Sequence, residues 1–191
     1  MNTSNQTTRV GLIIGMMVLA AFTRLIPHWP NFTAVLAVAL FGGAKFKNAA
    51  LAVIIPLVIM LITDLSYSTI HYGSTDVVVG FHSLMPLVYI CIAITSLIGI
   101  YVGKKSSAGF IIGGSIIAST LFFLVTNAGV WYHSPMFAQN AQGLISCYDL
   151  GLPFYRNEVI GDLFFNTILF GVFALASKRV PVLRTNYQEN R

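Results

Sequence analysis

Six apolar stretches follow one another along this chain, and most of them approach or exceed the roughly 18 to 20 residues that a helix needs to cross a bilayer. Of the 191 residues, 56% are hydrophobic and only 9% are charged, whereas a soluble domain has about 25% charged residues. So few charged side chains cannot cover a water-soluble globule. The alternating strands of an outer-membrane barrel are also missing from the sequence. We therefore predict an all-α integral membrane protein, a bundle of six transmembrane helices.

The six predicted spans differ in length. The second has only about 13 residues, so it needs its flanks to cross the bilayer or stops short of one interface. Pro56 and Pro86 fall inside the third and fourth spans, where proline removes a backbone hydrogen bond and predicts a kink. The first span lacks a preceding basic cluster and a following cleavage site, which indicates a retained helix. The spans cover residues 10–27, 32–44, 48–66, 83–102, 108–131 and 159–177.

Basic residues gather in alternate connections between the spans. By the positive-inside rule these connections face the cytoplasm, so we predict that both termini are cytoplasmic. Residues 1–9 then form a cytoplasmic N-terminus, 10–178 the transmembrane domain and 179–191 a cytoplasmic tail. The net charge of +5 reflects this topology, and we expect no nucleic-acid partner. The basic residues are Arg9, Lys45, Lys47, Lys104, Lys105, Lys178, Arg179, Arg184 and Arg191.

Polar and aromatic residues gather in the other three connections, which are expected to face outward. All four histidines lie there, at His28, His71, His82 and His133. The fifth connection, between the fifth and sixth spans, is expected to be a long outer loop from Tyr132 to Glu158. Loops of this length within a compact protein are usually functional or have structure of their own. We therefore expect this loop to cover a site as a lid.

The outer histidines allow two interpretations. Imidazole is a common metal ligand, so the histidines could converge on an ion or a metal-centred cofactor. They could equally lie at the headgroup level, as amphipathic side chains do. No metal-binding motif separates the two, so metal binding remains open and no cofactor is predicted.

The ionisable residues at the outer span ends are Arg24, Asp64, Glu158 and Asp162. A charge in the bilayer is costly, which favours pairing or a water-filled cavity. Arg24 therefore either pairs with Asp64 or Asp162, or contacts a ligand. No carboxylate pair at helical spacing is expected in the middle of a span, and hydrolase, zinc-protease and phosphate-loop motifs are missing. We therefore expect a protein that is not an enzyme.

Polar residues at the outer ends of the spans, together with an aromatic wall, suit a small organic ligand. We predict that the protein binds a small molecule from the outer face. On the opposite side, Gly11 and Gly15 form a small-residue face that either packs inside the bundle or docks a membrane partner. The predicted ligand-binding residues are Asn31, Asp64, His82, Asn127, Trp131 and His133.

Five segments resemble an uncharacterised family of small bacterial six-span membrane proteins, which is similar to the S components of energy-coupling-factor (ECF) vitamin transporters. The segments are RLIPHWPNF (24–32), LFGGAKF (40–46), GFHSLMPLVY (80–89), FFLVTN (122–127) and PFYRNEVIGDL (153–163). The resemblance implies a multi-pass protein of the bacterial cytoplasmic (inner) membrane that binds substrate outside. It also implies docking through the first span, where Gly11 and Gly15 lie, onto a coupling subunit with ATPases.

Among substrates we favour cobalamin or another corrinoid, because the S components for it are of similar size and cobalt accepts a histidine such as His82. Another vitamin fits nearly as well. Two alternatives from other classes remain. One is a metal-dependent membrane enzyme that uses the outer histidines and carboxylates, and the other is a structural assembly subunit.

Overall fold

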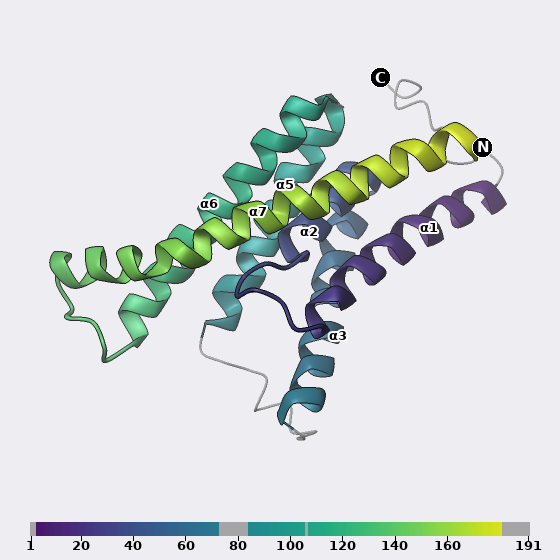
Figure 1. Cartoon of the computed structure of the whole chain (residues 1–191). Helices are drawn as coiled ribbons and strands as arrows, with labels where there is room; N and C mark the ends of the chain where they lie inside the picture. Colours follow the sequence, from purple (N-terminus) through teal and green to yellow (C-terminus); the bar gives the residue numbers. More distant parts are fainter. Residues whose placement is uncertain (1–2, 73–83, 106, 181–191) are drawn as a thin grey trace.

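The computed structural model describes residues 3–72, 84–105 and 107–180. The regular structure within these ranges is entirely helical, without a strand (Figure 1). The expected N-terminal tail, residues 1–9, is helical from Thr3 onward, and most of the expected C-terminal tail lies outside the described residues. The elements are α1 (Thr3–Phe22), the 3-10 turn η1 (Thr23–Leu25), α2 (Val35–Lys45), α3 (Ala49–Tyr72), α5 (Met85–Lys105), α6 (Ala108–His133) and α7 (Ala141–Arg179).

Five of the described helices, α1, α3, α5, α6 and α7, are long and apolar enough to cross a membrane. Their outer surfaces expose large apolar side chains, among them Leu19, Ile54, Leu97, Ile117 and Leu175. Water-soluble monomers rarely expose apolar surface on this scale. The chain is therefore a multi-pass membrane protein, as the long apolar runs predict.

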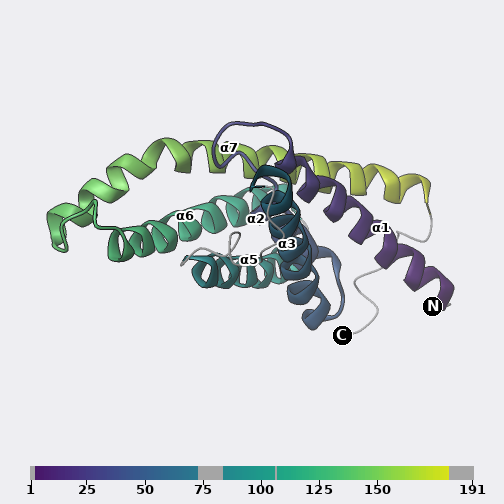
Figure 2. The same cartoon turned by 90° about the horizontal axis from the view of Figure 1, so that it is seen from below.

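The short helix α2 lies at the centre of the bundle, with α5, α3, α7, α1 and α6 around it (Figure 2). Every residue from Leu36 to Ala44 is buried. At about 1.5 Å per residue the 11-residue helix is roughly 16 Å long, about half of the hydrocarbon thickness. The predicted shortness of this segment is confirmed. Because other helices surround it, α2 does not need the length of a lipid-facing span.

Small residues bring α2 and α5 into backbone contact. A Cβ atom on Gly43 would collide with the backbone oxygen of Ser96, and one on Gly99 with that of Leu40. One turn further along, a Cβ on Gly103 would lie 2.6 Å from the Ala44 oxygen. Only glycine leaves room for such an approach, which is typical of packing between membrane helices.

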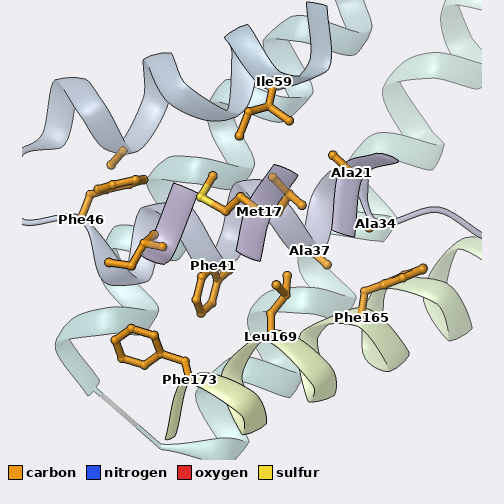
Figure 3. Packing of buried hydrophobic residues seen from close by; sticks show 13 residues of the cluster. Met17, Ala21, Ala34, Ala37, Phe41, Phe46, Ile59, Phe165, Leu169 and Phe173 are labelled. Carbon is orange, nitrogen blue, oxygen red and sulfur yellow. The ribbon is translucent and has the colours of Figure 1, made fainter. Parts of the chain in front are cut away.

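Apolar side chains fill the space between α1, α2, α3 and α7. Met17 of α1 and Phe41 of α2 are fully buried, and Ile59 and Phe173 reach the same cluster from α3 and α7 (Figure 3). The ring of Phe41 lies edge-on to those of Phe170 and Phe173, at centroid distances of 5.2 and 5.8 Å. This cluster fixes α7 against the same helix that α5 contacts by its backbone.

The fifth connection differs from the expected long loop. α6 extends to His133 and α7 begins at Ala141, so only residues 134–140 link them. The Asn140 side chain accepts a hydrogen bond from the Gly143 backbone N–H at 2.9 Å and caps α7. Gly143 and Gly151 therefore do not indicate a loop. A Cβ at Gly143 would collide with the Ala138 oxygen, and Gly151 packs against Phe123 and Asn127 of α6.

The prolines also need one correction. Pro86 is the second residue of α5, in the first turn, where a backbone N–H has no partner within the helix. The predicted kink at Pro86 inside this span is therefore wrong. Pro56 lies inside α3 as predicted. Pro153, which was expected in a loop, lies inside α7.

Candidate functional site

The predicted outer-face residues that the structure describes lie on separate parts of the bundle. Asn127, Trp131 and His133 lie near the end of the α6–α7 hairpin, which projects away from α3 in both views (Figures 1 and 2), and Asp64 is a residue of α3. Asn31 is exposed in the segment between η1 and α2, with a φ of 60°, a left-handed conformation that asparagine tolerates. His82 lies outside the described residues.

Asp64 forms an ion pair with Arg24, which is one of the two pairings that the sequence allowed. Arg24 Nη1 lies 2.7 Å from Asp64 Oδ1, and it also donates to Thr63 Oγ1 at 3.2 Å. The Tyr89 hydroxyl donates to the second carboxylate oxygen at 3.0 Å. The pair therefore ties η1, α3 and α5 together and satisfies both charges, which fits a structural role.

The polar side chains near the end of the α6–α7 hairpin form their hydrogen bonds with backbone oxygens of the same hairpin. Trp131 Nε1 donates to the Ala138 oxygen at 2.9 Å, and the Gln139 side chain donates to the Trp131 oxygen at 2.8 Å. The Asn127 amide donates to the Phe123 oxygen, and the His133 ring bonds the Gly129 oxygen. The two Trp131 contacts fasten the turn at residues 134–140, and the other two lie within α6. The loop that was expected to be a lid is instead a short, bonded turn.

The histidines do not form a metal site within the described part of the chain. No group of three or more histidine, cysteine or acidic side chains that could hold an ion occurs there. His28 is exposed and bonds the Ile26 oxygen at 2.8 Å. The side chain of His71 is not among those described.

A layer of polar side chains lies inside the bundle instead. On α7, Glu158, Asp162 and Asn166 follow at intervals of four residues and are 7%, 2% and 2% exposed. Residues spaced in this way share one face of a helix. That face meets α6, where Ser119 Oγ donates to Asp162 Oδ2 at 2.6 Å and Asn166 Nδ2 donates to Ser115 Oγ at 3.1 Å.

Asp162 also holds the beginning of α2. The Ala37 backbone N–H, in the first turn of α2, donates to the Asp162 carboxylate. The N-cap residue of this helix is Ala34, which has no side chain that could accept such a bond. Helix N-termini have unpaired N–H groups and a partial positive charge. The carboxylate on α7 therefore acts as the cap that α2 lacks in its own sequence.

The part of this layer on α2, α5 and α6 lies near the middle of the membrane-spanning region. Lys45, Lys105 and Arg179 end α2, α5 and α7 at one end of the bundle, which we call the basic end. At about 1.5 Å per residue, Ala37, Thr95 and Ser119 lie roughly 12 to 17 Å along their helices from this end. The hydrocarbon core is about 30 Å thick, so these three residues lie close to its centre. On the long helix α7, Asp162 and Glu158 lie further from the basic end, roughly 26 and 32 Å along the helix from Arg179.

Two buried atoms inside the bundle have no hydrogen-bond partner within the described residues, Oδ1 of Asn166 in this layer and Oγ1 of Thr95 on α5. Glu158 also has no hydrogen bond to any described residue, although it is 7% exposed. Asn166 lines a groove of about 200 Å³ between α6 and α7. Buried polar groups without partners cost about 1 to 3 kcal/mol each, so a ligand or water that pairs them would stabilise the protein.

The sequence interpretation named Glu158 and Asp162 as ionisable residues at the outer span ends but did not predict a layer that joins them to polar residues of α6. It started the sixth span at Val159, which placed Glu158 in a loop, and it excluded a carboxylate pair within a span. The structure shows that Glu158 and Asp162 are such a pair, one turn apart on α7. Their spacing was the available signal, and it becomes visible once the predicted span is continued back by one residue, from Val159 to Glu158.

Gly11 and Gly15 face outward from α1. A Cβ atom at either position would meet nothing within 4 Å. Within the described residues they therefore do not serve internal packing, and their shared face is open to lipid or to a partner.

A family model matches residues 4–183, nearly the whole chain. The chain belongs to DUF6580, a family of unknown function. No curated protein and no solved structure matches it. Membership of this family assigns no activity, and the comparisons do not connect the chain with the S components of ECF transporters. The function must therefore be inferred from the geometry of the polar layer.

Proposed function

We propose that this protein binds a small, positively charged or donor-rich solute in the polar layer, as the substrate-binding membrane subunit of an uptake system. The observation that supports this proposal is the buried pair Glu158 and Asp162. Ionisable residues inside a membrane are rare and usually mark a pathway or a ligand site. Nothing in the described residues points to catalysis.

The two carboxyl groups have different roles in this proposal. Asp162 is occupied by Ser119 and by the start of α2. Glu158 has no such partners among the described residues, so its oxygens are available to a ligand. Two carboxylates one turn apart repel each other, and a cation between them removes that repulsion. The unpartnered atoms of Thr95 and Asn166 add a donor and an acceptor.

The transport class also fits the shape of α2. Transporters often place the end of a short, interrupted helix at the substrate site near the bilayer centre. α2 begins near the bilayer centre and its first turn contacts the same acidic residue. In this proposal all six helices belong to the bundle, both termini are cytoplasmic, and the ligand enters from the outer face of a bacterial inner membrane.

A narrower form of the proposal is an ECF S component for a vitamin such as cobalamin, which docks on a coupling subunit through Gly11 and Gly15. It rests on the sequence resemblance. The outward position of both glycines supports the docking part, because a partner helix could approach closely there. Changing both glycines to leucine should then stop co-purification with the coupling subunit while the bundle still folds.

The test begins with native mass spectrometry of the purified protein, to detect a co-purified solute. A calorimetric panel of organic cations and vitamins, corrinoids included, follows on three proteins: wild type, Glu158→Gln and Asp149→Asn. Asp149 is an exposed acid on α7, so Asp149→Asn is the matched control for loss of one charge. We expect Glu158→Gln to weaken binding at least tenfold and Asp149→Asn to leave it unchanged.

The predicted outer-face pocket gives a different result in the same assay. If the ligand binds there, Trp131→Ala or His82→Ala should weaken binding, because the aromatic ring supplies contact area and the imidazole can ligate cobalt. Unchanged affinity in Glu158→Gln with reduced affinity in Trp131→Ala would therefore overturn the assignment of the site to the polar layer.

A further inference from the structure

A second cavity, of about 140 Å³, lies at the basic end between α1 and the α2–α3 connection. Three cationic side chains line it, those of Arg9, Lys45 and Lys47. None of the described residues that line it is acidic. We call this cavity the basic pocket.

The cations of the basic pocket are held in place by protein contacts. Arg9 Nη2 donates to the Lys45 oxygen at 3.4 Å, at the end of α2. The Lys45 ammonium lies 5.0 Å from the ring centre of Phe170 and 4.8 Å from that of Phe173. Lysine and arginine side chains that only mark topology normally extend into water. Here two of them are anchored beside each other, although like charges repel.

One atom of the basic pocket has an unused donor. Arg9 Nε is buried, and within the described residues it has no hydrogen-bond partner. Its N–H and those of the guanidinium form a planar fork that matches the oxygens of a phosphate group. Asn48 uses its side-chain oxygen to cap α3, accepting from Ala50 at 2.8 Å and from Leu51 at 3.2 Å. Its amide N–H groups therefore remain as additional donors beside the cations.

The basic pocket also has an apolar wall, formed by Val10, Ile13, Phe46 and Leu51. It lies at the ends of membrane-spanning helices, the depth at which phospholipid headgroups lie. Basic pockets between transmembrane helices are known to hold anionic headgroups.

We propose that the basic pocket binds a phosphate group, supplied by an anionic phospholipid headgroup or by a soluble phosphate compound. The cations and the free Arg9 donor bind the phosphate oxygens, and the apolar wall suits the adjoining part of a lipid. This site is separate from the polar layer and does not depend on the proposed transport function.

The experiment measures lipid adducts by native mass spectrometry and thermal stability of the purified full-length protein, with phosphatidylglycerol and with zwitterionic phosphatidylcholine. Inorganic phosphate and glycerol 3-phosphate form the soluble arms. The test variant is Arg9→Gln with Lys47→Gln. The control is Lys104→Gln with Lys105→Gln, which loses the same charge at the end of α5 but outside the basic pocket.

We expect phosphatidylglycerol to bind and stabilise the wild type more than phosphatidylcholine does, and the test variant to bind it at least tenfold more weakly. The control variant should bind as the wild type does. Arg9→Lys keeps the charge without the planar fork, so its affinity for phosphatidylglycerol should lie between those of the wild type and the test variant. Gel filtration and circular dichroism establish that each variant is folded. Stabilisation by soluble phosphate that depends on Arg9 would support the site and identify a soluble source. Equal losses in the test and control variants, or no preference for phosphate in any arm, would overturn the proposal.

Discussion

The two sides of α2 are held by different kinds of contact. Toward α5 the contact is between backbones, and glycines at positions 43, 99 and 103 make room for it. Toward α7 the contact is chemical, because the Asp162 carboxylate accepts a hydrogen bond from the first turn of α2. The first contact restricts volume and accepts no added atom. The second contact depends on a hydrogen bond, so it should tolerate a change in the shape of the side chain at position 162 better than the loss of its acceptor oxygens.

The largest expected effect comes from adding one methyl group to the α2–α5 contact. In Gly99→Ala the new Cβ would collide with the Leu40 oxygen and lie 3.0 Å from the Gly43 Cα. Backbone atoms cannot move aside as a side chain can, so we expect a loss of about 3 kcal/mol in the free energy of unfolding, at the upper end of typical overpacking. Equilibrium unfolding in mixed micelles with SDS measures this.

Gly171→Ala is the matched control, because nothing lies within 4 Å of a Cβ there. Its free energy of unfolding should stay within about 0.5 kcal/mol of the wild type or rise slightly, since alanine favours a helix more than glycine does. Equal effects of the two substitutions would show that the backbone contact does not limit stability.

The next effect is on the chemical side of α2. Asp162→Leu removes the acceptor, which leaves the Ala37 N–H without its side-chain partner and the Ser119 hydroxyl with only the Ser115 oxygen of its own helix, at an expected cost of about 2 kcal/mol. Asp162→Asn keeps one acceptor oxygen for Ala37 and should cost less than about 1 kcal/mol by the same reasoning. The same unfolding assay compares the two, with Asp149→Leu as the exposed control. If Asn is as harmful as Leu, the negative charge and not the hydrogen bond holds α2.

An effect smaller than that of Asp162→Leu is expected at Ser115, the partner of Asn166 one turn further along α7. Ser115→Ala removes the acceptor of the Asn166 amide, whose oxygen already has no described partner. We expect a loss of about 1 kcal/mol, the usual value for one neutral hydrogen bond. Ser146→Ala on α7 serves as the control, because its hydroxyl bonds only the Gln142 oxygen of its own helix. A loss that matches the control would mean that the Ser115–Asn166 bond adds no stability.

The apolar part of the fold could be predicted from the sequence because hydrophobicity alone specifies it. Long apolar runs gave α1, α3, α5 and α6, and the run near α2 was correctly short. The first half of α7 was predicted as a loop because glycine and proline, here Gly143, Gly151 and Pro153, are typical of turns and loops. In the structure Gly143 and Gly151 serve close packing against the preceding turn and α6, which a local pattern cannot reveal.

The candidate site was harder to predict, since it depends on which faces of distant helices meet. The pairing of Arg24 with Asp64 could be predicted as one of two alternatives, because opposite charges near the ends of neighbouring spans attract each other. The capping of α2 by Asp162 was not, because donor and acceptor lie 125 positions apart and on different helices (162 − 37). The sequence analysis placed Glu158 and Asp162 at the outer membrane–water interface, whereas α7, which contains them, begins already at Ala141.

The central position of α2 also determines the order in which the protein can be assembled. During synthesis α2 emerges before α5 and α7, which provide its backbone contacts and its cap. A segment of 11 residues is too short to remain across the bilayer as an independent helix. We therefore expect α2 to take up its final place only after the last helix has been made, and insertion of α1 and α3 and docking of α2 to be separate events in the biogenesis of this protein.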